Sequence, residues 1–159
     1  MLYIEIYYSS LEKMKELKTK QDCALKTRNI FDAITASEAN PEHEAARSFF
    51  LKSVQTRVAM LYIMGKFLED QPVTASDVYN RLHPKFGSKS SFVTFIALGR
   101  KKGYFLLKSS KSDGRKKYII PSLAFTKHWC TFISRSEGIP LAKNIDWDTI
   151  YSPSCNCCD

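Results

Sequence analysis

The sequence predicts a mainly helical α+β fold, and three observations support this class. Apolar residues recur at helical spacing over most of the chain. Two short apolar runs, 104–107 and 118–120, flank a polar turn that contains a glycine, as in a β-hairpin. Hydrophobic residues make up 44% of the 159 residues, which is enough apolar material for the core of one compact domain.

The N-terminal half predicts two helices. The first spans 9–39, where a serine can cap the helix and apolar residues follow at loosely helical spacing. The second starts at 40–42, Asn-Pro-Glu, which supplies a cap, a proline at the first helical position and an acid near the positive end of the dipole. Its apolar pattern runs to residue 68 without an evident break. We therefore expect one long core helix over 41–68.

Two shorter helices are expected before the hairpin, and one after it. Thr74 and Asp77 have the spacing of a capping box, which starts a helix over 74–82. The segment 83–87, His-Pro-Lys-Phe-Gly, interrupts the pattern, and Ser88 then caps a helix over 88–102. Gly103 has the position of a left-handed residue that ends a helix. A last helix with apolar residues on one side follows the hairpin.

The order of these elements predicts a winged helix-turn-helix and divides the chain into four regions. Three helices followed by a two-stranded hairpin form a winged helix-turn-helix. A helix about 10–12 Å across fits the major groove of DNA, and the hairpin loop can reach the neighbouring minor groove. The expected regions are an N-terminal helical core and dimerisation region at 1–57, the winged helix-turn-helix at 58–121, a C-terminal dimerisation helix at 122–138, and an irregular cysteine-containing tail at 139–159.

The charge of the chain is concentrated in one segment. Its formal net charge is +8, and between Arg81 and Lys117 there are eleven lysines and arginines but one acid, Asp113. This segment therefore carries +10, and the remainder of the chain sums to −2. Such asymmetry is typical of a nucleic-acid-binding surface, although a solvated basic face would give the same count. The helical frame that carries the cations favours double-stranded DNA as the partner.

The candidate DNA contacts lie on the helix over 88–102 and on the hairpin loop. Lysines are expected to contact phosphates, while Ser90, Ser91 and Thr94 can contact bases or phosphates, or simply cap and cover the helix. Thr94 and its neighbours on the exposed side are short, so binding is expected to depend mainly on phosphates and groove shape. The candidates are Lys89, Ser90, Ser91, Thr94, Lys101, Lys102, Lys111, Arg115, Lys116 and Lys117.

The segment from Val58 to Trp129 resembles the MarR family of transcription regulators. The resemblance rests on T-A-S-D-V-Y-N-R-L, on S-K-S-S-F-V-T-F-I-A-L-G-R-K-K-G-Y and above all on S-D-G-R-K-K-Y, which contains the Asp-x-Arg pattern of that family's wing. It implies that Arg115 enters the minor groove while Asp113 braces the wing. Gly114 is expected to support the wing as well, by permitting a tight turn. The resemblance also implies a homodimer that is joined by the N- and C-terminal helices and binds a palindrome.

The five cysteines are expected to be reduced thiols of a cytoplasmic protein. Cys23 and Cys130 lie on the two helices that the resemblance places at the dimer interface, where some family members sense peroxide. A structural thiol is the alternative for each. The tail cysteines Cys155, Cys157 and Cys158 have no closed zinc-site spacing, so we expect neither a metal nor another cofactor.

The sequence carries no catalytic motif, so no enzymatic activity is expected. Its histidines are scattered, and no metalloprotease, nucleophile-elbow or phosphate-loop pattern occurs. No apolar run approaches the roughly 20 residues of a membrane helix. A small-molecule effector is a further candidate partner, with Phe49, Phe50 and Tyr62 as candidate lining residues.

Two other functions fit the same expected fold. One is a replication or partition factor of a mobile element, which would bind DNA repeats. The other is a winged-helix interaction module whose basic face binds an acidic protein. Sequence preference and steep salt dependence of DNA binding would favour the regulator.

Overall fold

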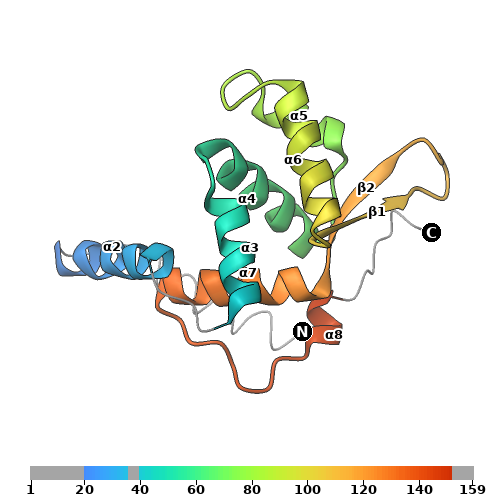
Figure 1. Ribbon diagram of the computed structural model, residues 1–159. Helices are drawn as coiled ribbons and strands as arrows, with labels where there is room; N and C mark the ends of the chain where they lie inside the picture. Colours follow the sequence, from blue (N-terminus) through green and yellow to red (C-terminus); the bar gives the residue numbers. More distant parts are fainter. Residues whose placement is uncertain (1–19, 36–39, 152–159) are drawn as a thin grey trace. The chain divides into compact units, whose positions relative to one another are not determined.

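The computed structural model of the chain describes residues 20–35 and 40–151, which are mainly helical with one small antiparallel sheet (Figure 1). This confirms the expected α+β class. The chain forms two compact units, and in the described parts the first consists of 20–35 with 133–140 and the second of 40–132 with 141–151. No helix in the described ranges is both long enough and apolar enough to cross a membrane.

The first unit contains helix α2 (Lys20–Thr35) and the end of helix α7 (Leu123–Glu137). Lys26 pairs with Glu137 at 3.8 Å between the ammonium nitrogen and the carboxylate oxygen. The helix predicted over 9–39 is confirmed from 20 to 35, and its remainder lies outside the described residues. Ala33 is the buried residue of α2, whereas four large apolar side chains are exposed: Leu25, Ile30, Phe31 and Ile34.

The second unit contains the other helices and the sheet. Helices α5 and α6 contact each other, α6 also contacts β1, and α4 and α5 both contact β2. Its elements are α3 (Pro41–Leu51), α4 (Val54–Leu68), α5 (Ala75–Leu82), α6 (Lys89–Lys101), β1 (Phe105–Ser109), β2 (Lys117–Pro121), the first part of α7 and the short α8 (Trp147–Tyr151).

The prediction of a single helix over 41–68 is wrong, because the helix is interrupted between α3 and α4. Ser53 has extended backbone angles, φ −151° and ψ 166°, and its hydroxyl accepts a hydrogen bond from the amide of Thr56. The Thr56 hydroxyl in turn accepts one from the Ser53 amide at 3.0 Å. This capping box starts a new helix and satisfies amides that otherwise lack partners.

Aromatic side chains make up much of the core. Phe49 stacks on Phe95 with ring centroids 4.9 Å apart, which joins α3 to α6. Phe50 meets Trp129 of α7 with centroids at 5.2 Å, and both side chains are buried. Phe105 of β1 packs against Gly99 of α6 so closely that a Cβ there would lie 2.3 Å from the phenylalanine ring. Stacked and edge-on rings of this kind fix the position of α6 against the rest of the unit.

The hairpin is confirmed, and a third segment extends it. In the antiparallel register Phe105 lies opposite Pro121, and Lys108 lies opposite Tyr118. Thr74 also bridges Tyr118, and the amide of Ile119 donates to the carbonyl oxygen of Val73 at 2.8 Å. The segment just before α5 is therefore tied to the hairpin, so the start of α5 has a fixed place beside the sheet.

The prediction that 139–159 is irregular is wrong at Trp147–Tyr151, which form the short helix α8. Asp146 starts this helix by accepting hydrogen bonds from the amides of Asp148 and Thr149 at 3.1 and 3.2 Å. The hydrogen bonds that the Thr149 hydroxyl and backbone donate lower the pKa of Asp146. Residues 152–159, with Cys155, Cys157 and Cys158, lie outside the described part of the chain.

The expected regions and the observed units have different limits. The expected limit at 57–58 falls inside α4, and the limit between the two compact units falls inside α7, after residue 132. The last helix, expected over 122–138, is observed as α7 and is started by Ser122, whose hydroxyl accepts from the amide of Phe125 at 3.2 Å.

Candidate nucleic-acid interface

The two helices before the hairpin begin as the sequence predicts. Thr74 and Asp77 form a reciprocal capping box, with the Asp77 carboxylate accepting from the Thr74 amide at 2.8 Å. Gly87 has φ +149°, and a Cβ at this position would lie 2.1 Å from the Gln55 carboxamide nitrogen. The loop between α5 and α6 therefore packs closely against the start of α4, which sets where α6 begins.

The hydroxyl groups at the start of α6 bind one another. Ser88 caps the helix by accepting from the amide of Ser91 at 3.3 Å. Its oxygen also lies 2.9 Å from the hydroxyl of Ser90 and 2.7 Å from that of Ser91. Two of the candidate base-contacting hydroxyls are thus already engaged at the cap, and Ser91 is partly buried as well.

Helix α6 has a buried side and an exposed side. The buried side consists of Phe92, Phe95, Ile96 and Gly99, which pack into the core. The exposed side combines cations, hydroxyls and small apolar groups, and the helix contains no acid. Its exposed residues are Lys89, Ser90, Val93, Thr94, Ala97, Arg100 and Lys101, and exposed Lys102 follows as the cap.

The β1–β2 loop is a turn stabilised by Asp113. The Asp113 carboxylate accepts a hydrogen bond from the amide of Arg115 at 3.0 Å, and its carbonyl oxygen accepts from the amide of Lys116 at 2.9 Å. The amide of Asp113 also donates to the hydroxyl of buried Ser110 at 3.4 Å. Asp113 thus orders the backbone at Arg115, which determines where the arginine side chain starts.

The expected role of Gly114, to permit a tight turn, is not observed. The φ of this glycine lies outside the left-handed region, and a Cβ would meet no atom within 4 Å. The turn therefore has no steric requirement for glycine at position 114. Gly103 differs, because its φ of +74° ends α6 in the expected left-handed conformation.

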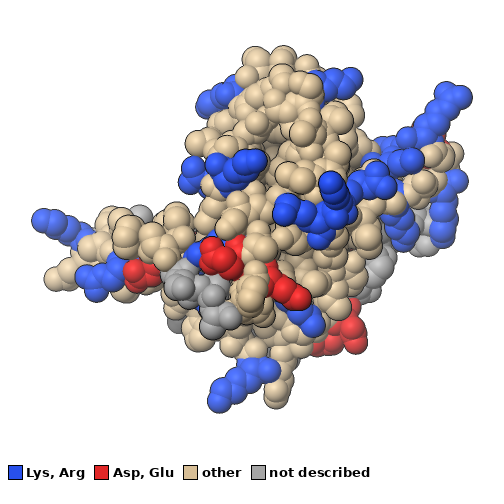
Figure 2. Space-filling model, viewed as in Figure 1, with Lys and Arg blue, Asp and Glu red and all other residues tan. Residues whose placement is uncertain are grey.

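Lysine and arginine side chains gather on the hairpin and its loop (Figure 2). Lys116 lies over the ring of Tyr118, with its nitrogen 5.2 Å from the ring centroid. The exposed cations of this region are Lys108, Lys111, Arg115, Lys116 and Lys117. Helix α6 contacts β1, so the basic end of α6 lies on an element adjacent to the basic hairpin.

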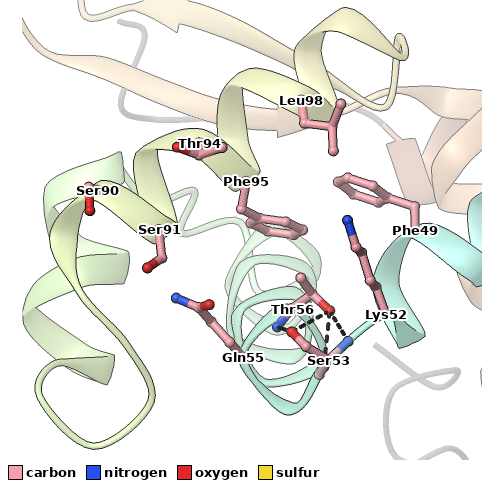
Figure 3. A pocket seen from close by; sticks show the side chains of 10 residues that line it. All are labelled: Phe49, Lys52, Ser53, Gln55, Thr56, Ser90, Ser91, Thr94, Phe95 and Leu98. Carbon is pink, nitrogen blue, oxygen red and sulfur yellow. Dashed lines mark hydrogen bonds between the residues drawn. The ribbon is translucent and has the colours of Figure 1, made fainter.

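A pocket of about 490 Å³ borders the exposed side of α6. Its apolar wall is made by Phe49, Phe95 and Leu98, and the start of α4 supplies polar groups opposite Ser90, Ser91 and Thr94 (Figure 3). The Gln55 carboxamide nitrogen is buried and has no hydrogen-bond partner. Of the residues expected to line an effector site, Phe49 borders this pocket.

The two candidate redox cysteines have different surroundings. Cys23 is exposed on α2. Cys130 is partly buried on α7, and burial raises the pKa of its thiol. A raised pKa lowers the thiolate fraction at neutral pH, and the thiolate is the form that reacts with peroxide. This environment favours the structural interpretation for Cys130. No group of three or more metal-binding side chains occurs among the residues described.

Three residues of this region were not predicted from the sequence. Lys52 and Gln55 line the pocket because the chain breaks beside them, and that break was missed. The spacing of Ser53 and Thr56 is the signal that could have revealed it. Val93 lies on the exposed side of α6 with 50% of its surface accessible, and sequence periodicity alone did not single it out.

Comparisons of this chain with protein-family models, with curated proteins and with solved structures found no significant match.

Proposed function

We propose that this chain is a sequence-specific, double-stranded DNA-binding transcriptional regulator of the winged helix-turn-helix class. In this proposal α5 and α6 are the helix-turn-helix, and the β1–β2 hairpin is the wing. The supporting observation is that α6 and the hairpin are in contact and both carry exposed cations. These two elements contain one acid, Asp113, whose carboxylate accepts a hydrogen bond from a backbone amide. The end of α6 supplies cations for phosphates, and Arg115 at the turn can enter the minor groove.

The binding sites on the genome would test this assignment directly. We expect them to lie at promoters, where occupancy blocks or recruits the polymerase. Clustered repeats near a replication origin would instead identify a replication or partition factor. If no DNA is bound even at low salt, the basic surface would have to serve an acidic protein, and the proposed function would be wrong.

Salt should weaken DNA binding steeply, because each phosphate contact releases condensed counterions. The logarithm of affinity should fall with the logarithm of salt by about 0.9 for each phosphate neutralised. Replacing Lys101 by glutamine should reduce that slope by about 0.9. The matched control is Lys143→Gln between α7 and α8, which changes the charge equally outside the proposed DNA-binding surface and the proposed dimer helices and should leave the slope unchanged. Equal slopes for the Lys101 variant and the unmodified chain would contradict a phosphate contact there.

The exposed apolar residues of α2 support a homodimer. Phe31 has 64% of its surface accessible and Leu25 has 57%, on a helix with little buried surface of its own. Pairing with a second copy would remove this apolar surface from water. The second helix proposed for the dimer interface is α7.

A charged residue in place of Phe31 should dissociate this dimer. We expect Phe31→Glu to halve the mass in sedimentation equilibrium, because an ionised carboxylate in an apolar interface is strongly disfavoured. Asn80→Glu adds the same charge at an exposed polar residue of α5, outside the helices proposed for the dimer interface, and should have a much smaller effect. If both variants keep the mass of the unmodified protein, α2 is not the dimer interface.

The pocket beside α6 supports control by a small molecule. Its polar side includes Ser90, Ser91 and Thr94, which are also candidate DNA contacts. A ligand in the pocket would therefore touch the DNA-binding helix directly, and its binding would be coupled to that of DNA.

A further inference from the structure

The middle of the exposed side of α6 carries methyl groups and no long polar side chain. Val93 has 50% of its surface accessible, and Thr94 and Ala97 are exposed beside it. Val93 and Ala97 are four positions apart and so lie one above the other on the same face. This central part of the exposed side therefore offers a partner apolar contacts rather than hydrogen bonds.

The charged side chains of α6 lie at the two ends of the helix, and two of its hydroxyl groups form hydrogen bonds at the cap. Lys89 lies at the start of α6, while Arg100 and Lys101 lie at its end. The hydroxyls of Ser90 and Ser91 bind Ser88 at the cap. The central turns therefore offer no arginine, asparagine or glutamine that could form a bidentate hydrogen bond with a base.

In the major groove, the C5 methyl of thymine is the apolar group that a helix meets on a base edge. Resting on the proposed function, we propose that Val93, Ala97 and the Thr94 methyl bind thymine methyl groups. The ligand is thus duplex DNA whose half-site has A·T pairs under the centre of α6. Charge complementarity supports this occupant, because cations at both ends of the helix meet the phosphates that border the groove.

Replacing thymine by deoxyuridine tests this inference, because it removes the methyl group and leaves the base pair's hydrogen-bonding edge unchanged. Bound sequences are first selected from a random duplex library, and the selected site is then synthesised with deoxyuridine at each thymine in turn. We expect about fourfold weaker binding for each contacted methyl, as for transfer of one methyl group from water. Substitution at thymines outside the α6 contact should have no effect.

A variant of the protein links the effect to Val93. Threonine has the same shape as valine but replaces one methyl by a hydroxyl, so Val93→Thr should reduce the discrimination between thymine and deoxyuridine. Leu61→Ala on α4 is the control, since Leu61 is similarly exposed at 56% but lies outside the proposed surface. It should keep the full discrimination.

The outcomes separate this inference from the proposed function. Selection of a defined sequence that tolerates deoxyuridine at every thymine overturns the methyl contact and leaves the regulator intact. Discrimination that Val93→Thr leaves unchanged also overturns the assignment to Val93. Failure to bind any duplex at low salt overturns the proposed function itself, and this inference with it. Retention of an acidic protein in that last case would identify the other class of partner.

Discussion

Replacing Gly99 by alanine is expected to destabilise the protein by about 1 kcal/mol, although alanine is the better helix former. An added Cβ would lie 2.3 Å from the ring of Phe105 and 3.2 Å from that of Phe49. Phe105 is buried, with 1% of its surface accessible, so its ring cannot move into solvent. Overpacking a core costs typically 1–3 kcal/mol, whereas the gain in helix propensity is about 1 kcal/mol at most.

Gly65→Ala is the matched control for this prediction. Gly65 also lies inside a helix, α4, but it is exposed and a Cβ would meet no atom within 4 Å. This substitution should therefore stabilise the protein by roughly 0.5–1 kcal/mol. Urea unfolding of both variants measures the two free energies. A Gly99→Ala protein as stable as the Gly65→Ala protein would show that β1 does not press on α6 as described.

The sequence was informative where a helix start is encoded by a few adjacent residues. The capping box of Thr74 and Asp77 and the serine cap at Ser88 are local, and both are confirmed. The break at Ser53 was missed because apolar residues continue on both sides of it at helical spacing. The bridge between Thr74 and Tyr118 joins residues far apart in the sequence, and no local pattern encodes such a pairing.

In the candidate site, too, local sequence predicts some features, while others depend on the tertiary structure. Its cations could be found by counting charges, because lysine and arginine are exposed wherever the fold places them. The engagement of the Ser90 and Ser91 hydroxyls depends on the geometry of the cap. Likewise, the pocket exists because the break before α4 lies opposite α6, and this arrangement requires the tertiary structure.

Arg115→Ala should weaken DNA binding by about tenfold or more while leaving thermal stability unchanged. Charge-assisted hydrogen bonds contribute roughly 1.5–3 kcal/mol, and 1.4 kcal/mol corresponds to a tenfold change in affinity. The side chain is exposed at the turn, so its removal takes no packing from the core. A gel-shift titration beside a melting curve measures both quantities. Unchanged affinity would exclude Arg115 as a DNA contact.

Asp113 is predicted to act differently, through the order of the turn, and two substitutions can separate order from charge. Asp113→Ala removes the acceptor of the Arg115 amide and also removes a negative charge that repels phosphates. Asp113→Asn removes the same charge but keeps a side-chain oxygen that can accept the hydrogen bond. If order matters, Asp113→Asn should bind DNA at least as tightly as the unmodified chain, and Asp113→Ala should bind more weakly. If the carboxylate only repels DNA, both variants should bind more tightly by similar factors, and the bracing function of Asp113 would be wrong.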